Sequence, residues 1–394
     1  MGKDNFFDRK NDWSKIKDDL LGYYLKLYFS KVLMTGFPVT YIDAFAGKGM
    51  FDDGEKGSPV IALDISEVAI NNSSISNAKI SSFFIERKFI KDLSKNTANR
   101  NATTIKGSFE DEIEGILKKC IGQNVFLYVD PFGIKSLPFD KFLLLKKINF
   151  KSIELLLNLN TFGFLREGCR LLKYRDFSIS TDGLEERESF EGTKKVNDIP
   201  NMNRIANGDY WKIIISDYNN GTINAFEAEE RFVNRYCEQL KQVFNFAINI
   251  PIKARRLKNM PKYRMVFCSN HKHGLIEMAN NMFKRWKQMQ EDERNGQLIL
   301  FELDINFRGA ALQQDYEKIV REILSCDFIK YEDLVCKLII KHGILCDMGK
   351  IKEVIKKMET NESVEIRRNP ALTPNGKPSN WFDYKKDLNV RLVK

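Results

Sequence analysis

The sequence predicts an α/β fold with a parallel, doubly wound, Rossmann-like sheet, and two observations lead to that prediction. The segments NVFLYVDPFG (124–133) and SIELLLNLNTF (152–162) are continuous apolar runs, as expected of strands that are buried on both faces. Earlier in the chain, shorter strand-like runs alternate with helix-patterned segments. That alternation is typical of parallel strands joined by crossover helices.

Periodicity and turn residues predict the first elements. Apolar positions recur at helical spacing over 12–35, which predicts a helix before the first strand. A strand over 39–45 runs into a turn with two glycines. GSPVIALDIS then begins a helix, with Ser58 as its N-cap and Pro59 at its first position. ISSFFIER (80–87) and the weaker NATTIKGS (101–108) predict two further strands.

The middle of the chain interrupts this alternation. Residues 166–222 are polar and contain Gly and Asn, and we expect an insertion on the carboxyl side of the strands, where ligands enter such sheets. A helix over 226–241 and a hairpin of NFAINIPIKA and YRMVFCSN follow. A helix over about 274–289 then completes an expected first domain, residues 1–303.

Residues 304–394 are expected to form a winged-helix domain. Helices near 312–325, 331–342 and 348–360 precede two short β-like runs around a Pro/Gly/Lys turn. Three helices followed by a basic β-hairpin are the pattern of that domain. Residues 311–394 carry 16 basic and 13 acidic side chains, so this domain is as compatible with docking a protein as with binding nucleic acid.

Composition limits the classes of protein. The chain has 394 residues, 43% hydrophobic and 29% charged, which describes an ordinary globular protein. It has no apolar run of the roughly 18 residues that span a bilayer, and its N-terminus is polar, so we expect a cytoplasmic protein without a membrane partner. Seven cysteines without a C-x-x-C pair indicate reduced thiols. With only three histidines, no metal site is expected.

The positive charge is concentrated in one window. The chain carries a net charge of +10, and residues 251–290 contain ten lysines and arginines against one acid. This window is either a solvated hairpin and helix or a surface that faces phosphates, since clustered basic side chains release counterions from nucleic acid. On the second interpretation the candidate contacts are Arg255, Arg256, Lys258 and Lys262, together with Arg367, Arg368 and Lys377 in the expected wing.

The glycine turn lies in the segment YIDAFAGKGMF (41–51). Gly47 and Gly49 let the backbone approach a ligand, and Asp43 ends the strand before them. Lys48-Gly49-Met50 lacks the hydroxyl of a P-loop, and Asp52 stands where a dinucleotide site has its third glycine. Because three acids follow the turn (Asp52, Asp53 and Glu55), a cationic cofactor without phosphate fits better. S-adenosylmethionine, with its sulfonium and ammonium groups, is such a cofactor.

Two further strand ends supply candidate site residues. Glu86 ends the strand FFIER, where an acid commonly binds ribose hydroxyls; the alternative is a surface pair with Arg87. Ser108, in KGSFED, is expected beside the adenine. Asp130, Pro131 and Phe132 follow a buried strand, so Asp130 can accept hydrogen bonds from a substrate and Phe132 can stack on a base. The alternative for these residues is a helix-capping acid and a core aromatic.

Together the segments YIDAFAGKGMF, GSPVIALDI, LYVDPFGIKSLPF and LLLNLNTFGFLRE resemble the three-Cys-motif partner (TcmP) family. The resemblance covers most of residues 10–300 and implies a doubly wound Rossmann-like methyltransferase sheet, with a C-terminal winged helix. It implies that Asp43, Phe45, Gly47 and Gly49 line the methionine side of S-adenosylmethionine, with Glu86 at the ribose and Asp130 at the acceptor. DPFG is also similar to the D-P-P-Y/F motif of amino-methyltransferases, with one proline instead of two. A bacterial setting with a protein partner encoded nearby would fit this family.

Three functions are therefore open at the level of sequence. The first is an S-adenosylmethionine-dependent methyltransferase acting on DNA or RNA. The second is a non-catalytic partner protein that binds nucleic acid or a nucleoside through the same fold. The third is an oxidoreductase or nucleotidyl-transfer enzyme, which the missing third glycine and the acidic turn disfavour.

Overall fold

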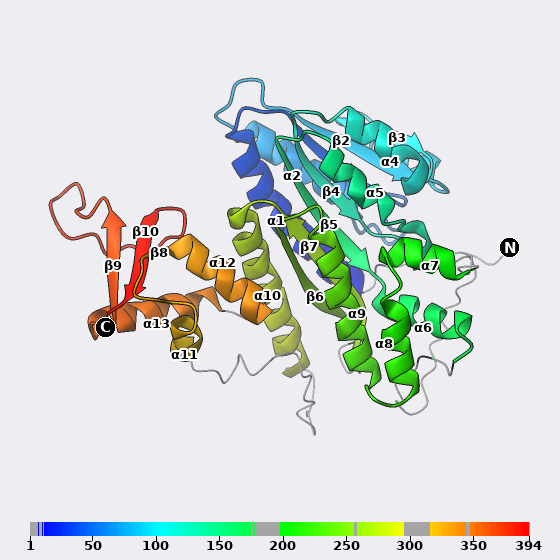
Figure 1. Cartoon of the computed structure of the whole chain (residues 1–394). Coiled ribbons are helices and arrows are strands. Elements are labelled where there is room, and N and C mark those ends of the chain that lie inside the picture. The colour runs from blue at the N-terminus through cyan, green and yellow to red at the C-terminus, as the bar shows by residue number, and fades with distance from the viewer. Residues whose placement is uncertain are drawn as a thin grey trace. The chain divides into compact units, whose positions relative to one another are not determined.

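The computed structural model describes residues 7, 10, 12–174, 177, 198–255, 258–294, 316–343 and 347–393. Over 12–13, 253–262 and 289–294 it describes the backbone alone. The chain divides into two compact units, Met1–Asn270 and His271–Lys394 (Figure 1). No helix in the described ranges combines the length and apolarity that crossing a bilayer requires.

The first unit contains a seven-stranded sheet with the order β3-β2-β1-β4-β5-β7-β6. Its strands are β1 (Val39–Asp43), β2 (Ile80–Glu86), β3 (Ala102–Lys106), β4 (Asn124–Val129), β5 (Ser152–Leu159), β6 (Phe246–Arg255) and β7 (Lys258–Ser269). The five strands from β3 to β5 pair in parallel, whereas β7 is antiparallel to both β5 and β6. This order and direction confirm the predicted α/β fold with a Rossmann-like sheet.

Helices cover both faces of this sheet, as a doubly wound fold requires (Figure 1). On one face, Tyr24 and Tyr28 of α1 (Asp12–Leu33) pack against Phe126 of β4. On the other, β-strand side chains such as Leu127 and Leu155 join a core with several helices. Those helices include α4 (Phe109–Lys118), α5 (Asp140–Leu143), α6 (Thr161–Leu171), α7 (Ile199–Ala206), α8 (Trp211–Asn219) and α9 (Ala225–Leu240). The central strands β4 and β5 are buried on both faces, which explains their continuous apolar runs.

Two local predictions need correction. The strand predicted over 152–162 ends at Leu159, because the side chain of Asn160 accepts a hydrogen bond from the Gly163 N–H at 2.7 Å and starts α6. The N-cap of α2 (Ser58–Asn71) is Gly57, so Ser58 is helical and its hydroxyl bonds elsewhere.

The segment 166–222, predicted as an insertion, contains the end of α6 and all of α7 and α8, whose apolar faces are buried. Residues 175, 176 and 178–197 of this segment lie outside the described residues.

The second unit begins with α10 (Lys272–Arg294) and continues with α11 (Tyr316–Arg321), β8 (Ile329–Lys330), α12 (Tyr331–His342) and α13 (Met348–Thr360). A hairpin of β9 (Val364–Asn369) and β10 (Asp387–Leu392) ends it, in a small sheet of order β8-β10-β9 (Figure 1). The helix predicted over 312–325 is described only from Tyr316, because 312–315 lie outside the described residues. Buried side chains of α12, α13 and β10 form this unit's core.

Candidate functional site

The candidate residues of the first unit gather at the carboxyl ends of four adjacent parallel strands. β1 ends at Asp43, β2 at Glu86 and β5 at Leu159, and Asp130 follows directly after β4. β1 pairs with β2 on one side and with β4 on the other. Their neighbourhood is therefore the point where the strand order reverses, and ligands of open α/β sheets bind there.

The glycine turn after β1 has a backbone that favours glycine. Gly47 and Gly49 have φ angles of 61° and 80°, in the left-handed region. The turn is held from two directions: the Gly47 N–H donates to a carboxylate oxygen of Glu86 at 2.9 Å, and the Gly57 N–H donates to the Gly49 carbonyl at 2.9 Å. The turn is thus fixed against β2 and against the start of α2.

Asp43 is fully buried and has no basic partner in the part of the chain that the structure describes. Its carboxylate accepts hydrogen bonds from the Ser58 hydroxyl at 2.6 Å and from the Phe45 N–H at 3.1 Å. Burial, with a smaller contribution from the carboxylates of Asp130 and Asp18, raises the pKa of Asp43 to about 7, against the two hydrogen bonds, which lower it. Near neutral pH the group is therefore divided between its neutral and charged forms, and a cation placed beside it would favour the charged form.

Glu86 is buried, and its carboxylate accepts hydrogen bonds from the backbone around it. One carboxylate oxygen accepts from the Gly47 N–H, and the other accepts from the N–H groups of Lys88 and Phe89 at 2.6 and 3.0 Å. A carboxylate offers about four acceptor positions, so these three donors leave about one for a hydroxyl group. The structure therefore gives Glu86 a role in fixing the turn, and not the surface pair with Arg87.

Asp130 is held by side chains from two other elements. Its Oδ2 accepts from the Lys17 ammonium on α1 at 2.6 Å and from the Tyr128 hydroxyl at 3.3 Å. Its Oδ1 accepts from the Asn158 Nδ2 on β5 at 2.6 Å. The Lys17 side chain is 9% exposed and that of Asp130 is 22% exposed, so a remaining part of the carboxylate faces solvent.

Sequence reasoning missed both Lys17 and Asn158. For Asn158 a signal existed, because an amide within the apolar run LLLNLN is unexpected in a strand that is buried on both faces. For Lys17 there was none, since a lysine on an N-terminal helix is ordinary. Beside them, Asp18 pairs with Lys10 at 2.7 Å, and burial raises the pKa of Asp18 to about 6.

An aromatic ring from the N-terminal segment covers the glycine turn. Phe7 is buried, and a Cβ built on Gly47 would lie 3.0 Å from its ring. The Phe7 ring centroid lies 4.9 Å from that of Phe89 and 6.4 Å from that of Phe132, and its carbonyl accepts from the Asp52 N–H at 2.8 Å. The Phe7 ring thus packs on the side of the turn where a side chain at Gly47 would lie.

The other predicted residues of this unit have mixed positions. Pro131 is buried, whereas Phe132 is 50% exposed. Phe45 packs against Phe109, with ring centroids 5.8 Å apart. Ser108 is the N-cap of α4 and both donates to and accepts from Asp111, which gives it a structural role.

The predicted nucleic-acid contacts are only partly described. Arg256 lies outside the described residues, and so do the side chains of Arg255, Lys258 and Lys262. In the second unit, Lys377 is exposed in the connection between β9 and β10, and Arg367 is exposed and stacks over Phe328 at 4.0 Å. The Arg368 side chain is only 8% exposed. Its guanidinium bonds Glu359 through two nitrogens, at 2.6 and 2.8 Å, so it holds α13 to β9 and is not placed to reach a phosphate.

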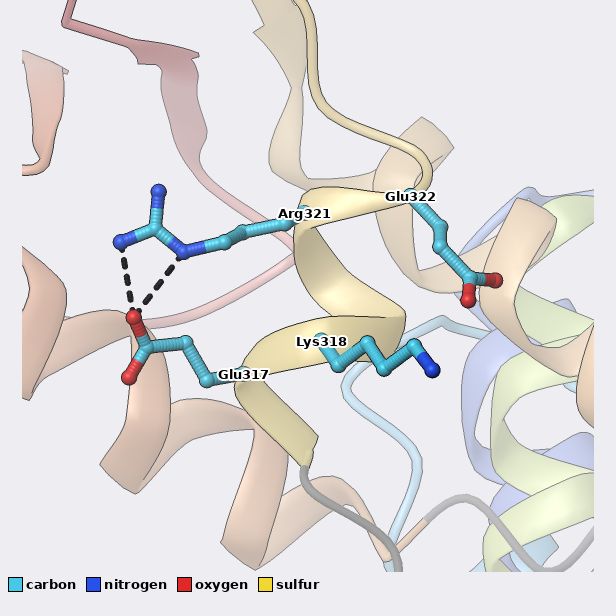
Figure 2. A pocket seen from close by; sticks show the side chains of 4 residues that line it. All are labelled: Glu317, Lys318, Arg321 and Glu322. Atoms are coloured by element: carbon cyan, nitrogen blue, oxygen red, sulfur yellow. Dashed lines mark hydrogen bonds and ion pairs between the residues drawn. The ribbon is translucent and has the colours of Figure 1, made fainter.

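A hollow of about 400 Å³ in the second unit shares no residue with the strand-end site. Figure 2 shows the four charged side chains that line it: Glu317, Lys318 and Arg321 of α11, and Glu322 directly after that helix. Arg321 donates to Glu317 at 2.7 Å, an ordinary pair one helical turn apart. Within the described ranges no three His, Cys, Asp or Glu side chains are grouped as metal ligands.

No family model matches the chain, and no curated protein sequence matches it closely. One solved structure to which the chain is similar is that of Trm1 from Pyrococcus horikoshii in complex with S-adenosyl-L-methionine. The match covers 98% of this chain and 95% of that one, with 11% sequence identity and a TM-score of 0.33. A likeness this weak says nothing about chemistry, so the function has to be inferred from the strand order and from the side chains at the strand ends.

Proposed function

We propose that this protein is an S-adenosylmethionine-dependent methyltransferase that acts on nucleic acid. The observation that carries the proposal is the pair of features at the switch point of the sheet. At the end of β1 a buried carboxyl group, without a basic partner among the described residues, precedes a glycine turn, and a partly open carboxylate follows the neighbouring β4. The first suits a cationic cofactor, and the second suits the group that is modified.

The cofactor side is assigned to Asp43, Phe45, Gly47 and Gly49. S-adenosylmethionine, when bound, supplies an electrophilic methyl group on a sulfonium. The Asp43 carboxyl would stabilise positive charge, and the two glycines would allow the backbone to approach the ligand. The free acceptor position of Glu86 suits a ribose hydroxyl, and Ser108 would lie toward the adenine.

The acceptor side is assigned to Asp130, Pro131 and Phe132. Asp130 would accept a hydrogen bond from the acceptor group and orient it, while the exposed Phe132 ring would stack on a base. Rate enhancement would then come mainly from holding the two reactants in line. The second unit, which we interpret as a winged helix, and the basic 251–290 segment would hold the phosphate backbone through residues such as Lys377 and Arg367. The resemblance to the TcmP family, with a partner protein, belongs to this proposal.

A second candidate is a non-catalytic partner protein that binds nucleic acid or a nucleoside. The packing of Phe7 against Gly47 favours it, because that ring already lies against the glycine turn to which we assign the cofactor. Transfer of a methyl group separates the two candidates.

The test is calorimetric titration with S-adenosylmethionine and S-adenosylhomocysteine, followed by transfer of tritiated methyl groups to pools of DNA, RNA and protein. We expect micromolar binding that Asp43→Ala abolishes and that Glu67→Gln, a change of an exposed acid on α2, leaves intact. Transfer to a nucleic-acid pool would support the enzyme. Cofactor binding without transfer, or nucleic-acid binding without cofactor binding, would favour the partner protein.

A further inference from the structure

Asn158 lies on β5 among fully buried leucines. It is 3% exposed, and its neighbours Leu157 and Leu159 are fully buried. Strand alternation places Asn158 on the same face of the sheet as Glu154, which accepts from the Tyr24 hydroxyl on α1. An amide in this position is costly unless it is hydrogen-bonded.

The hydrogen bonds of Asn158 are incomplete. Its Nδ2 donates to Asp130 at 2.6 Å, whereas its buried Oδ1 has no partner among the described residues. A buried acceptor without a partner costs about as much as one net hydrogen bond returns, or more. The amide therefore brings no net stability, and its one bond goes to the carboxylate that we assign to the acceptor.

Lys17 holds the other oxygen of the same carboxylate. Its ammonium lies 2.6 Å from the Asp130 Oδ2 and 5.3 Å from the centre of the Tyr263 ring. Two buried carboxyl groups, Asp18 and Asp43, also act on this neighbourhood, since both interact electrostatically with Asp130. Lys17 thus brings a positive charge to the most exposed of these three acidic side chains.

We propose that Asn158 and Lys17 are positioning residues that hold the Asp130 carboxylate in the orientation required for its role toward the acceptor. Each fixes one carboxylate oxygen from a different element, so rotation of the carboxylate is prevented. The Tyr128 hydroxyl, at 3.3 Å, completes three of about four acceptor positions, and the remaining one is left for the substrate. This inference rests on the proposed function, because it presupposes that Asp130 meets the acceptor.

The test is a double-mutant cycle of Asn158→Leu and Asp130→Asn, measured as methyl transfer to the nucleic-acid pool that the wild type modifies. We expect Asn158→Leu to lower kcat at least tenfold while S-adenosylhomocysteine affinity stays within twofold. Its urea midpoint should equal or exceed that of the wild type. In the Asp130→Asn background, Asn158→Leu should cause no further loss.

Asn124→Leu is the matched control. It replaces a second buried asparagine, which is the first residue of β4 and so lies at the amino end of the strand, away from the strand-end site. Asn124 is satisfied on both sides, since it donates to Thr35 at 3.0 Å and accepts from Ser152 at 2.7 Å. Its replacement should lower the urea midpoint. In the double variant with Asp130→Asn, the effects of the two substitutions on kcat should be independent of each other. Lys17→Met should lower kcat as Asn158→Leu does, whereas Lys17→Arg, which keeps the positive charge, should retain most of the wild-type kcat. This comparison does not depend on the activity of Asp130→Asn.

Two results would overturn the inference alone. One is a loss of urea midpoint in Asn158→Leu with unchanged transfer per folded molecule, which would make the amide structural. The other is a cycle in which Asn158→Leu and Asp130→Asn lower kcat independently, together with a kcat of Lys17→Arg that is as low as that of Lys17→Met. The absence of transfer by the wild type would instead refute the proposed function, and the role of Asp130 with it.

Discussion

Replacing Asp43 with asparagine should stabilise the protein increasingly as the pH rises from 5 to 7. Asp43 is fully buried, and its pKa is raised from 3.8 to about 7 chiefly by burial. Between these values the unfolded chain carries the charged carboxylate and the folded chain carries the neutral acid. The folded state then binds more protons, so the free energy of unfolding of the wild type falls as the pH rises.

The magnitude follows from the pKa difference. One pKa unit corresponds to about 1.4 kcal/mol, so two units between pH 5 and pH 7 cost the wild type about 2–3 kcal/mol through this group. Asp43→Asn lacks that cost. The contributions of Asp18 and Glu154, whose pKa values burial raises to about 6 and about 7, are present in both proteins. Removing the Asp43 carboxylate also relieves its repulsion of Asp18, which changes the difference in the same direction.

The assay is urea unfolding of both proteins at pH 5, 6, 7, 8 and 9. The difference in free energy of unfolding should grow up to about pH 7 and then level off. A difference that does not change with pH would show that Asp43 does not titrate in this range. A difference that shrinks would show that the folded state stabilises the charged form, and our account of the site would then be wrong.

Three further outcomes are expected. Gly47→Ala should lower cofactor affinity more than tenfold, because the φ angle of Gly47 is 61° and the Phe7 ring lies 3.0 Å from the new Cβ. Gly36→Ala is the control for backbone strain alone, because Gly36 has a φ angle of 71° and no atom within 4 Å of the new Cβ. Arg264→Met should cost about 3–5 kcal/mol in urea unfolding, since Glu229 loses its buried partner at 2.5 Å; Glu229→Gln in the same chain should recover part of it. Lys377→Ala should weaken nucleic-acid binding and reduce its salt dependence by about one ion without changing stability; an unchanged salt slope would exclude it as a phosphate contact.

Local signals predicted the sheet and part of the site. The apolar runs around β4 and β5 could be recognised because both faces of those strands are covered, and the glycine turn could be recognised because its φ angles exclude most side chains. Asp43 and Asp130 could be selected as candidates because Asp43 is the last residue of a buried strand and Asp130 directly follows another. The end of β5 was misplaced by three residues because the cap at Asn160 overrides an apolar sequence that continues into α6.

The partners of those residues could not be predicted from local sequence. Lys17 and Asp130 are 113 positions apart, and Asn158 is 28 positions from Asp130. They meet because α1 packs on the same face of the sheet from which Asn158 projects. Phe7 reaches the glycine turn in the same way, through a packing arrangement that no spacing in the sequence records.

The sequence by itself determined which segments form buried strands and which carboxyl groups stand at or just after the ends of β1, β2 and β4. Burial repeats with the period of the backbone, so a single segment carries that information. Only the tertiary structure decided that Asp43 has no basic partner in the described part of the chain, whereas Asp130 is held by Lys17 and Asn158. The charge and orientation of a buried carboxylate depend on neighbours brought together by packing, and those neighbours come from segments that are distant in the chain.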